Sequence, residues 1–321
     1  LTAEIAGIAA RFPEDVGVHE QWADALFNRA VGQEQGVKLR VAGEIAHIAA
    51  KFPQQTKIHL TWAEALASAT AGKAAPKSCE HLAGRIAMIA ARFPDHAPIH
   101  RQWSLALFNA TVGQESDACE RLASQIAQIA GRFPEDAYIH EEWCKAIFNA
   151  SFEQDPAARR RLAQAIAAIA ARFPEHAPIH VQWAKALSHA TVDEDPAVAE
   201  QLAREIGEIA GRFPADATTQ LQWARAIVNA TVGREPEAQE RFAATIGQIA
   251  SRFPMDAAIH VEWSKALFNA TISQDPEARE RLAGEIELIA ARFPAEAAIH
   301  LQWSMALVNA TSGRDGRARL R

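Results

Sequence analysis

One motif recurs eight times along the chain at an almost constant spacing. Each copy contains Phe-Pro, and a tryptophan follows the proline nine residues later. The Phe-Pro pairs lie at 12–13, 52–53, 93–94, 133–134, 173–174, 213–214, 253–254 and 293–294, and the tryptophans are Trp22, Trp62, Trp103, Trp143, Trp183, Trp223, Trp263 and Trp303. The period is 40 residues, with one 41-residue step between Pro53 and Pro94. A fixed period of this length is typical of stacked repeats, in which each unit packs only on its neighbours.

Each repeat contains two helical patterns, and the first is clearest in residues 276–293. Leu282, Ile286 and Ile289 recur there at helical spacing. Asp275-Pro276 supplies an N-cap carboxylate followed by a proline at the first helical position. The Phe-Pro pair ends the helix because proline disfavours the helical conformation of the residue before it. We call this the B helix and expect a length of roughly 15 residues.

The second pattern, the A helix, is clearest in residues 257–271. Ile259, Trp263 and Leu267 are spaced four residues apart and share one face. Glycine follows the pattern in four copies and would supply a left-handed stop; these glycines are Gly32, Gly72, Gly113 and Gly233. The short connection from B to A predicts an antiparallel hairpin. The sequence therefore predicts an all-α solenoid of about eight antiparallel helix hairpins, forming a single array over residues 1–321.

Neither end of the array has the polar cap that solenoids usually need. Leu1 aligns with Leu282 inside a B helix, and Arg321 aligns with Arg281, so Leu1 placed after Arg321 would continue the repeat in register. We interpret the chain as a segment of a longer array. The alternative is head-to-tail or ring association through the bare ends.

The repeat resembles the tetratricopeptide repeat. Trp263-Ser264 and Leu267 fall where that family has Leu-Gly and Tyr, and Leu282, Ile286 and Pro294 match its second helix. The repeat here is about six residues longer than the family's 34, and Sel1-like repeats also lengthen this loop. The resemblance covers the whole chain. It implies a right-handed superhelix whose A helices line the inner, concave face, and a role in protein–protein binding.

Composition excludes several classes of function. The net charge of −6 and pI of about 6.1 argue against a dedicated nucleic-acid binder. No apolar run is long enough to span a membrane, and the N-terminal residues lack the basic region of a signal peptide. Three cysteines without metal-binding spacing predict reduced thiols and a cytoplasmic location.

A histidine stands three residues before seven of the eight tryptophans. Gln220 takes the place of the histidine before Trp223. The histidines are His19, His59, His100, His140, His180, His260 and His300. Equivalent positions in stacked helices lie about 10 Å apart, too far to share a metal ion. We therefore predict a hydrogen-bonding role at the hairpin junction, and no metal or cofactor.

The tryptophans are predicted to be structural core, because they share the apolar face of the A helix. The opposite side of that helix is the candidate peptide-binding groove. Its asparagines are Asn28, Asn109, Asn149, Asn229, Asn269 and Asn309, its aromatic residues are Phe108, Phe148 and Phe268, and its basic residues are Lys145, Lys185, Arg225 and Lys265.

Two interpretations of this side remain open. Asparagine amides pair well with a peptide backbone, and the basic residues favour an acidic segment over the C-terminal half. Alternatively, Asn closes the last turn of the helix, Phe packs between A helices, and Lys pairs with Glu141, Glu142 and Glu262 one turn earlier.

No phosphate-binding loop, nucleophile elbow or zinc-protease motif occurs, so we do not expect an enzyme. Asn-Ala-Thr at several helix ends follows from the repeat, and we do not expect it to be glycosylated. Our main hypothesis is a repeat scaffold that binds a protein or peptide along the A helices. The alternatives are a self-assembling structural array and, third, a helical-repeat RNA reader.

Overall fold

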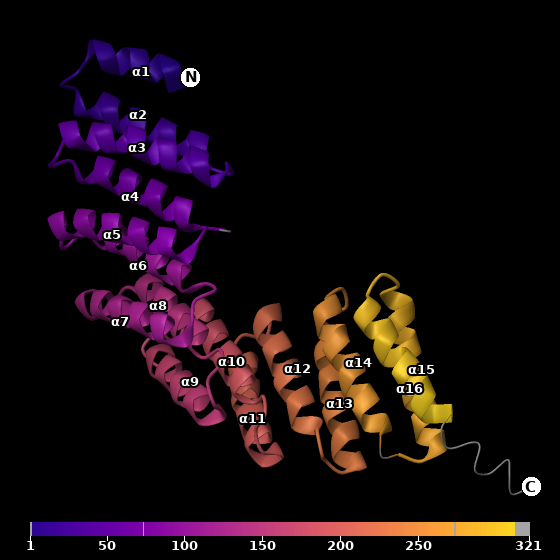
Figure 1. The fold of residues 1–321 in the computed structure, drawn as a ribbon. Coiled ribbons are helices and arrows are strands. Elements are labelled where there is room, and N and C mark those ends of the chain that lie inside the picture. The colour runs from indigo at the N-terminus through magenta and orange to yellow at the C-terminus, as the bar shows by residue number, and fades with distance from the viewer. Residues whose placement is uncertain (1, 73, 273, 312–321) are drawn as a thin grey trace, which may run out of the picture. The chain divides into compact units, whose positions relative to one another are not determined.

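The computed structural model describes residues 2–72, 74–272 and 274–311. These residues form sixteen helices and no strand, with B and A helices alternating along the chain (Figure 1). The B helices are α1 (Thr2–Arg11), α3 (Gln35–Lys51), α5 (Pro76–Arg92), α7 (Ser116–Arg132), α9 (Pro156–Ala170), α11 (Pro196–Arg212), α13 (Pro236–Arg252) and α15 (Pro276–Arg292). The A helices are α2 (Val16–Ala30), α4 (Thr56–Thr70), α6 (Ala97–Thr111), α8 (Ala137–Ala150), α10 (Ala177–Ala190), α12 (Ala217–Thr231), α14 (Ala257–Thr271) and α16 (Ala297–Thr311). The alignments at Leu1 and Arg321 lie outside the described residues.

The helix boundaries follow from local signals in the sequence. Asp155, Asp195 and Asp275 each cap the B helix that follows, by accepting a backbone N–H bond. The predicted glycine stops all have positive φ angles, between 71° and 88°. Where a repeat lacks that glycine, Glu153 and Asp193 adopt the left-handed conformation near the same turn. The B helices α11, α13 and α15 each have 17 residues, slightly longer than the sequence predicts.

The chain divides into two compact units, Leu1–Gln154 and Asp155–Arg321. Within each unit every B helix packs on the A helix that follows it, which confirms the antiparallel hairpins. Successive A helices also contact one another, in the series α2, α4, α6, α8 and the series α10, α12, α14, α16. The hairpins in each unit are therefore stacked as an all-α solenoid. The single array over 1–321 stays a prediction.

The two helix layers of a unit are packed differently. The A helices of neighbouring repeats lie close together, whereas the B helices of neighbouring repeats do not approach closely anywhere in the described residues. The core between the layers is isoleucine, leucine and alanine; Ile206, Ile246 and Ile286 are fully buried. Burial of one such side chain contributes roughly 1.5–3 kcal/mol. The open spacing of the B layer therefore leaves room between helices on that side.

None of the helices in the described ranges combines the length and the apolar character that a membrane crossing requires.

Candidate functional site

The asparagines of the A helices make the same contact in repeat after repeat. Each Asn Nδ2 donates to the hydroxyl of a threonine on the preceding A helix, at 2.8 Å for Asn109–Thr70, 2.7 Å for Asn149–Thr111, 2.7 Å for Asn229–Thr191, 2.9 Å for Asn269–Thr231 and 2.8 Å for Asn309–Thr271. Each threonine hydroxyl in turn donates to a carbonyl three residues earlier in its own helix, as Thr231 does to Val228. We call these bonds the Asn–Thr ladder.

The ladder uses only part of each amide. An asparagine side chain has two N–H donors and one carbonyl acceptor, and the ladder occupies one donor. Asn109, Asn149, Asn229, Asn269 and Asn309 are half-buried, and Asn28 in the first A helix is exposed. The asparagines therefore join neighbouring repeats and still present polar atoms on the surface of the A helices.

The predicted aromatic positions lie on the same surface. Phe108, Phe148 and Phe268 are half-buried. In unit Leu1–Gln154 the ammonium of Lys145 lies 5.5 Å from the centre of the Phe108 ring, within the range of a cation–π contact. Phe148 and Phe152 form an edge-to-face pair at 5.2 Å.

The basic residues of the A helices have different carboxylate partners. Lys145 pairs with both Glu141 (2.7 Å) and Glu142 (2.9 Å), so two acidic groups surround one cation and the local charge is −1. Burial raises the pKa of Glu142, and the Lys145 charge opposes this shift. These two ion pairs are those that the spacing along α8 predicts.

In unit Asp155–Arg321 the ratio of carboxylates to basic groups is reversed. Glu262 on α14 is only 5% exposed; it accepts from Lys265 at 3.1 Å and forms an ion pair with Arg225 of α12 at 3.5 Å. One carboxylate therefore serves two cations, and the local charge is +1. Lys185 lies on helix α10, is half-buried and interacts with another group of the chain.

The histidines lie at the junction between the two layers. The Nδ1 atoms of His19, His59, His140 and His260 contact the backbone carbonyl four residues earlier, at 2.8–3.1 Å. Gln220 stands at the equivalent position before Trp223, and its Nε2 donates to the Ala210 carbonyl at 2.8 Å. The predicted hydrogen-bonding role is therefore confirmed at these positions. No group of three or more metal-ligating side chains occurs in the described ranges.

All eight tryptophans are half-buried. Seven of their rings lie 6.0–6.3 Å from the neighbouring histidine rings, and Trp223 has Gln220 at that position instead. Each tryptophan thus covers part of the hairpin junction and keeps part of its indole at the surface.

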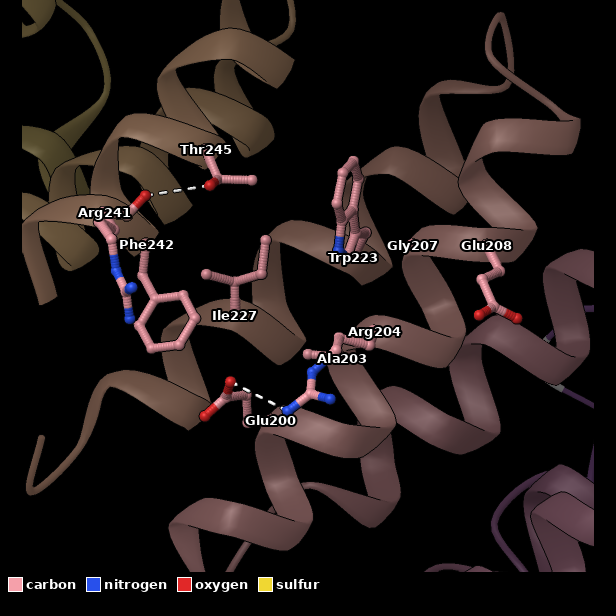
Figure 2. A pocket seen from close by; sticks show the side chains of 10 residues that line it. All are labelled: Glu200, Ala203, Arg204, Gly207, Glu208, Trp223, Ile227, Arg241, Phe242 and Thr245. Carbon is pink, nitrogen blue, oxygen red and sulfur yellow. Dashed lines mark hydrogen bonds and ion pairs between the residues drawn. The ribbon is translucent and has the colours of Figure 1, made fainter. Parts of the chain in front are cut away.

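Sequence reasoning missed two cavities on the B-helix side of unit Asp155–Arg321. The first, about 640 Å³, lies between α11 and α13, with Trp223 of α12 in its lining (Figure 2). The second, about 520 Å³, lies between α13 and α15 and includes Trp263.

A signal for both cavities is present in the sequence. Gly207 and Gly247 stand seven residues before the helix-ending proline, where five earlier repeats have alanine. A Cβ atom added to Gly207 would lie 3.0 Å from the Trp223 indole, and one added to Gly247 would lie 3.1 Å from the Trp263 indole. Each glycine therefore lets the indole lie directly against the B-helix backbone.

No family model matches the sequence, and no curated protein matches it. A solved chain described as "Computational Design of Self-Assembling Cyclic Protein Homooligomers" is similar at 14% identity, with 98% of each chain covered and a TM-score of 0.14. This TM-score is too low for the match to indicate a shared fold or function. The tetratricopeptide resemblance stays a prediction.

Proposed function

We propose that the chain is a helical-repeat binding scaffold, and that the exposed side of its A helices in unit Asp155–Arg321 binds an extended, acidic protein or peptide segment. The observation that carries this proposal is the pairing of Glu262 with both Lys265 and Arg225, which leaves one positive charge uncompensated. Arg225 is exposed and is therefore accessible to a partner.

The neighbouring asparagines supply the second element of recognition. Asn229 and Asn269 each keep one N–H and the carbonyl oxygen beyond their ladder bond. An extended peptide offers backbone donors and acceptors at regular spacing, so it suits a surface on which such amides recur once per repeat. The geometry around Lys145 supports a different preference, because two carboxylates already surround that ammonium.

The test measures binding of an array of extended peptides in acidic, neutral and basic series. Arg225→Glu places a second negative charge beside Glu262, and we expect acidic peptides to bind about tenfold more weakly or worse. Affinity of the parent protein should also fall with added salt.

Arg161→Glu is the matched control, since it makes the same change of charge at another exposed arginine, on the B helix α9 of the same unit. Equal losses in the two variants, or acidic peptides that bind no better than neutral ones, would rule out the A-helix surface.

A second candidate, self-association, is favoured by one helix. Leu301, Met305 and Val308 of α16 form an apolar stripe and are 56%, 38% and 63% exposed. The equivalent residues of α14, Val261, Lys265 and Phe268, are half-buried. A second copy stacked on α16 would cover this stripe, in the head-to-tail manner of successive repeats.

Analytical ultracentrifugation tests this candidate. The parent protein should form dimers or larger species as concentration rises, and Val308→Glu should abolish them by burying a charge in the contact. A parent protein that stays monomeric at high concentration would exclude stacking.

A further inference from the structure

We propose that the cavity between α11 and α13 is a binding site for an apolar monocarboxylic acid. The apolar part lies against Trp223 and Phe242, and the carboxylate pairs with Arg241. This site lies between two B helices, with Trp223 and Ile227 of α12 in its lining, and is distinct from the exposed A-helix surface proposed above.

The apolar part of the site comes from three side chains on two helices. Trp223 and Ile227 of α12 and Phe242 of α13 line the cavity (Figure 2). Phe242 replaces the leucine found at the same position in six other repeats, among them Leu202 and Leu282, and it is half-buried. Two aromatic rings at one cavity favour a ligand with a flat or branched apolar body.

Arg241 owes its availability to the pairing of its neighbours. In two other repeats the equivalent arginine binds the preceding B helix, as Arg121 binds Glu80 (3.0 Å) and Arg281 binds Glu240 (2.9 Å). The glutamate that would serve Arg241 is Glu200.

Glu200 is already engaged by two other arginines, Arg204 at 3.1 Å and Arg234 at 2.8 Å. Arg204 stands where other repeats have small or neutral residues, and Arg234 stands where Gln114 and Gln274 lie elsewhere. No carboxylate in the described part of the chain pairs with Arg241, whose side chain is exposed. Its guanidinium therefore has parallel N–H donors available to bind a ligand carboxylate in a bidentate way.

The other polar groups select the charge and direction of the ligand. The Trp223 indole N–H makes no hydrogen bond within the described residues and is directed toward the cavity in Figure 2. Glu208 lies at the opposite end of the cavity from Arg241 (Figure 2), so a ligand carboxylate is attracted to the α13 end and repelled from the other. With Glu200 also at the rim, a multiply charged anion such as phosphate is disfavoured relative to a monocarboxylate.

The second cavity has the same construction without the free cation. It has Trp263 on its A helix and Gly247 on its B helix, but its arginine, Arg281, pairs with both Glu240 and Glu285. The two cavities therefore form a natural comparison in which one feature, the unpaired arginine, differs.

Isothermal titration calorimetry of the whole chain tests the proposal, with 3-phenylpropionate, 3-phenylpropanamide and inorganic phosphate as probes. We expect 3-phenylpropionate to bind, and the amide and phosphate to bind about tenfold more weakly or worse. Arg241→Gln should weaken the acid by a similar factor and leave the amide unchanged. Gly207→Ala should weaken both, because the added methyl group displaces the indole.

Two variants in the second cavity are the matched controls. Arg281→Gln and Gly247→Ala make the same chemical changes one repeat away, and 3-phenylpropionate affinity should stay within twofold of the parent. Thermal unfolding of all variants checks that each is folded. A parent protein that does not bind the acid, an acid and amide of equal affinity, or equal losses in Arg241→Gln and Arg281→Gln would each overturn the proposal.

A peptide identifies the source of the carboxylate. Acetyl-Gly-Phe with a free C-terminus carries the same aromatic and acidic groups on a peptide backbone. Tighter binding than 3-phenylpropionate supports the proposal with a protein C-terminus as ligand, and weaker binding supports it with a free small acid.

Discussion

The A-helix layer and the B-helix layer of one unit join neighbouring repeats in opposite ways. In the A layer the helices are in close contact and the joining bonds are short and identical, from an Asn amide to a Thr hydroxyl. In the B layer the helices stand apart, and exposed Arg–Glu pairs such as Arg281–Glu240 bridge them. The A layer therefore sets the spacing of the repeats, whereas the spacing of the B helices can vary and leave cavities between them.

The largest effect on the free energy of unfolding should come from adding volume to the A layer, compared with the same addition in the B layer. Ala230 is fully buried in α12, and Ala230→Leu should cost about 3 kcal/mol because a close-packed site cannot absorb three more carbon atoms. Ala244→Leu makes the same change at an exposed site on α13 beside the second cavity, and should stay within about 0.5 kcal/mol. Urea unfolding measures both, and equal losses would contradict the contrast between the layers.

A smaller effect should follow from removing one hydroxyl. Thr231 is fully buried, accepts from Asn269 and donates to the Val228 carbonyl. Thr231→Val keeps the shape and leaves the Asn269 amide without its acceptor, so unfolding should become easier by about 2 kcal/mol.

The control for this change is Thr245→Val in the B layer. Thr245 is half-buried on α13 and donates only to a carbonyl of its own helix. Thr245→Val should therefore change the free energy of unfolding by no more than about 0.5 kcal/mol. Adding Asn269→Ala to Thr231→Val should lower the free energy of unfolding little further, because both changes break the same Asn269–Thr231 bond. Fully additive losses would show that the ladder bond does not couple the repeats.

The smallest effect concerns pH at the junction between the layers. Burial, and then the Arg212 charge, lower the pKa of His180 below its ordinary value. The folded protein thus keeps the ring neutral at pH values at which the unfolded chain binds a proton, and stability falls as the pH drops below about 6.5. His180→Gln should therefore lose less stability than the parent between neutral and mildly acidic pH. The change is small because His59, His100 and His260 have lowered pKa values too.

Gln220→His is the reverse variant. Gln220 is fully buried at the equivalent position, so a histidine there should make stability more sensitive to acid. Urea unfolding at two pH values measures the difference, and a Gln220→His protein with unchanged pH dependence would show that burial at the junction does not control protonation.

Most of the fold could be predicted because its signals are local. Helix α14 begins and ends at Ala257 and Thr271, the bounds that its apolar spacing predicts. The Asp-Pro starts, the Phe-Pro ends and the glycine stops each act within a few residues. The ion pairs of Lys145 follow in the same way from positions three and four residues apart on one helix.

The features that could not be predicted depend on contacts between repeats. Glu262 is shared with Arg225 of the preceding repeat, and no spacing within one helix reveals that partner. The first cavity depends on how closely Trp223 approaches Gly207 and on which of several arginines Glu200 binds. A repeat sequence shows that equivalent positions exist, but competition among neighbouring charges decides which group is left over.

The Asn–Thr ladder has a consequence for how an array of this kind changes length. A repeat with both ladder residues brings one donor for the repeat before it and one acceptor for the repeat after it, as Asn269 and Thr271 do. An in-register duplication of a 40-residue segment that carries both residues would therefore form the same Asn–Thr bond at its new junction. Repeats that carry both residues are interchangeable at this contact, so the ladder permits a change in copy number without a compensating substitution there.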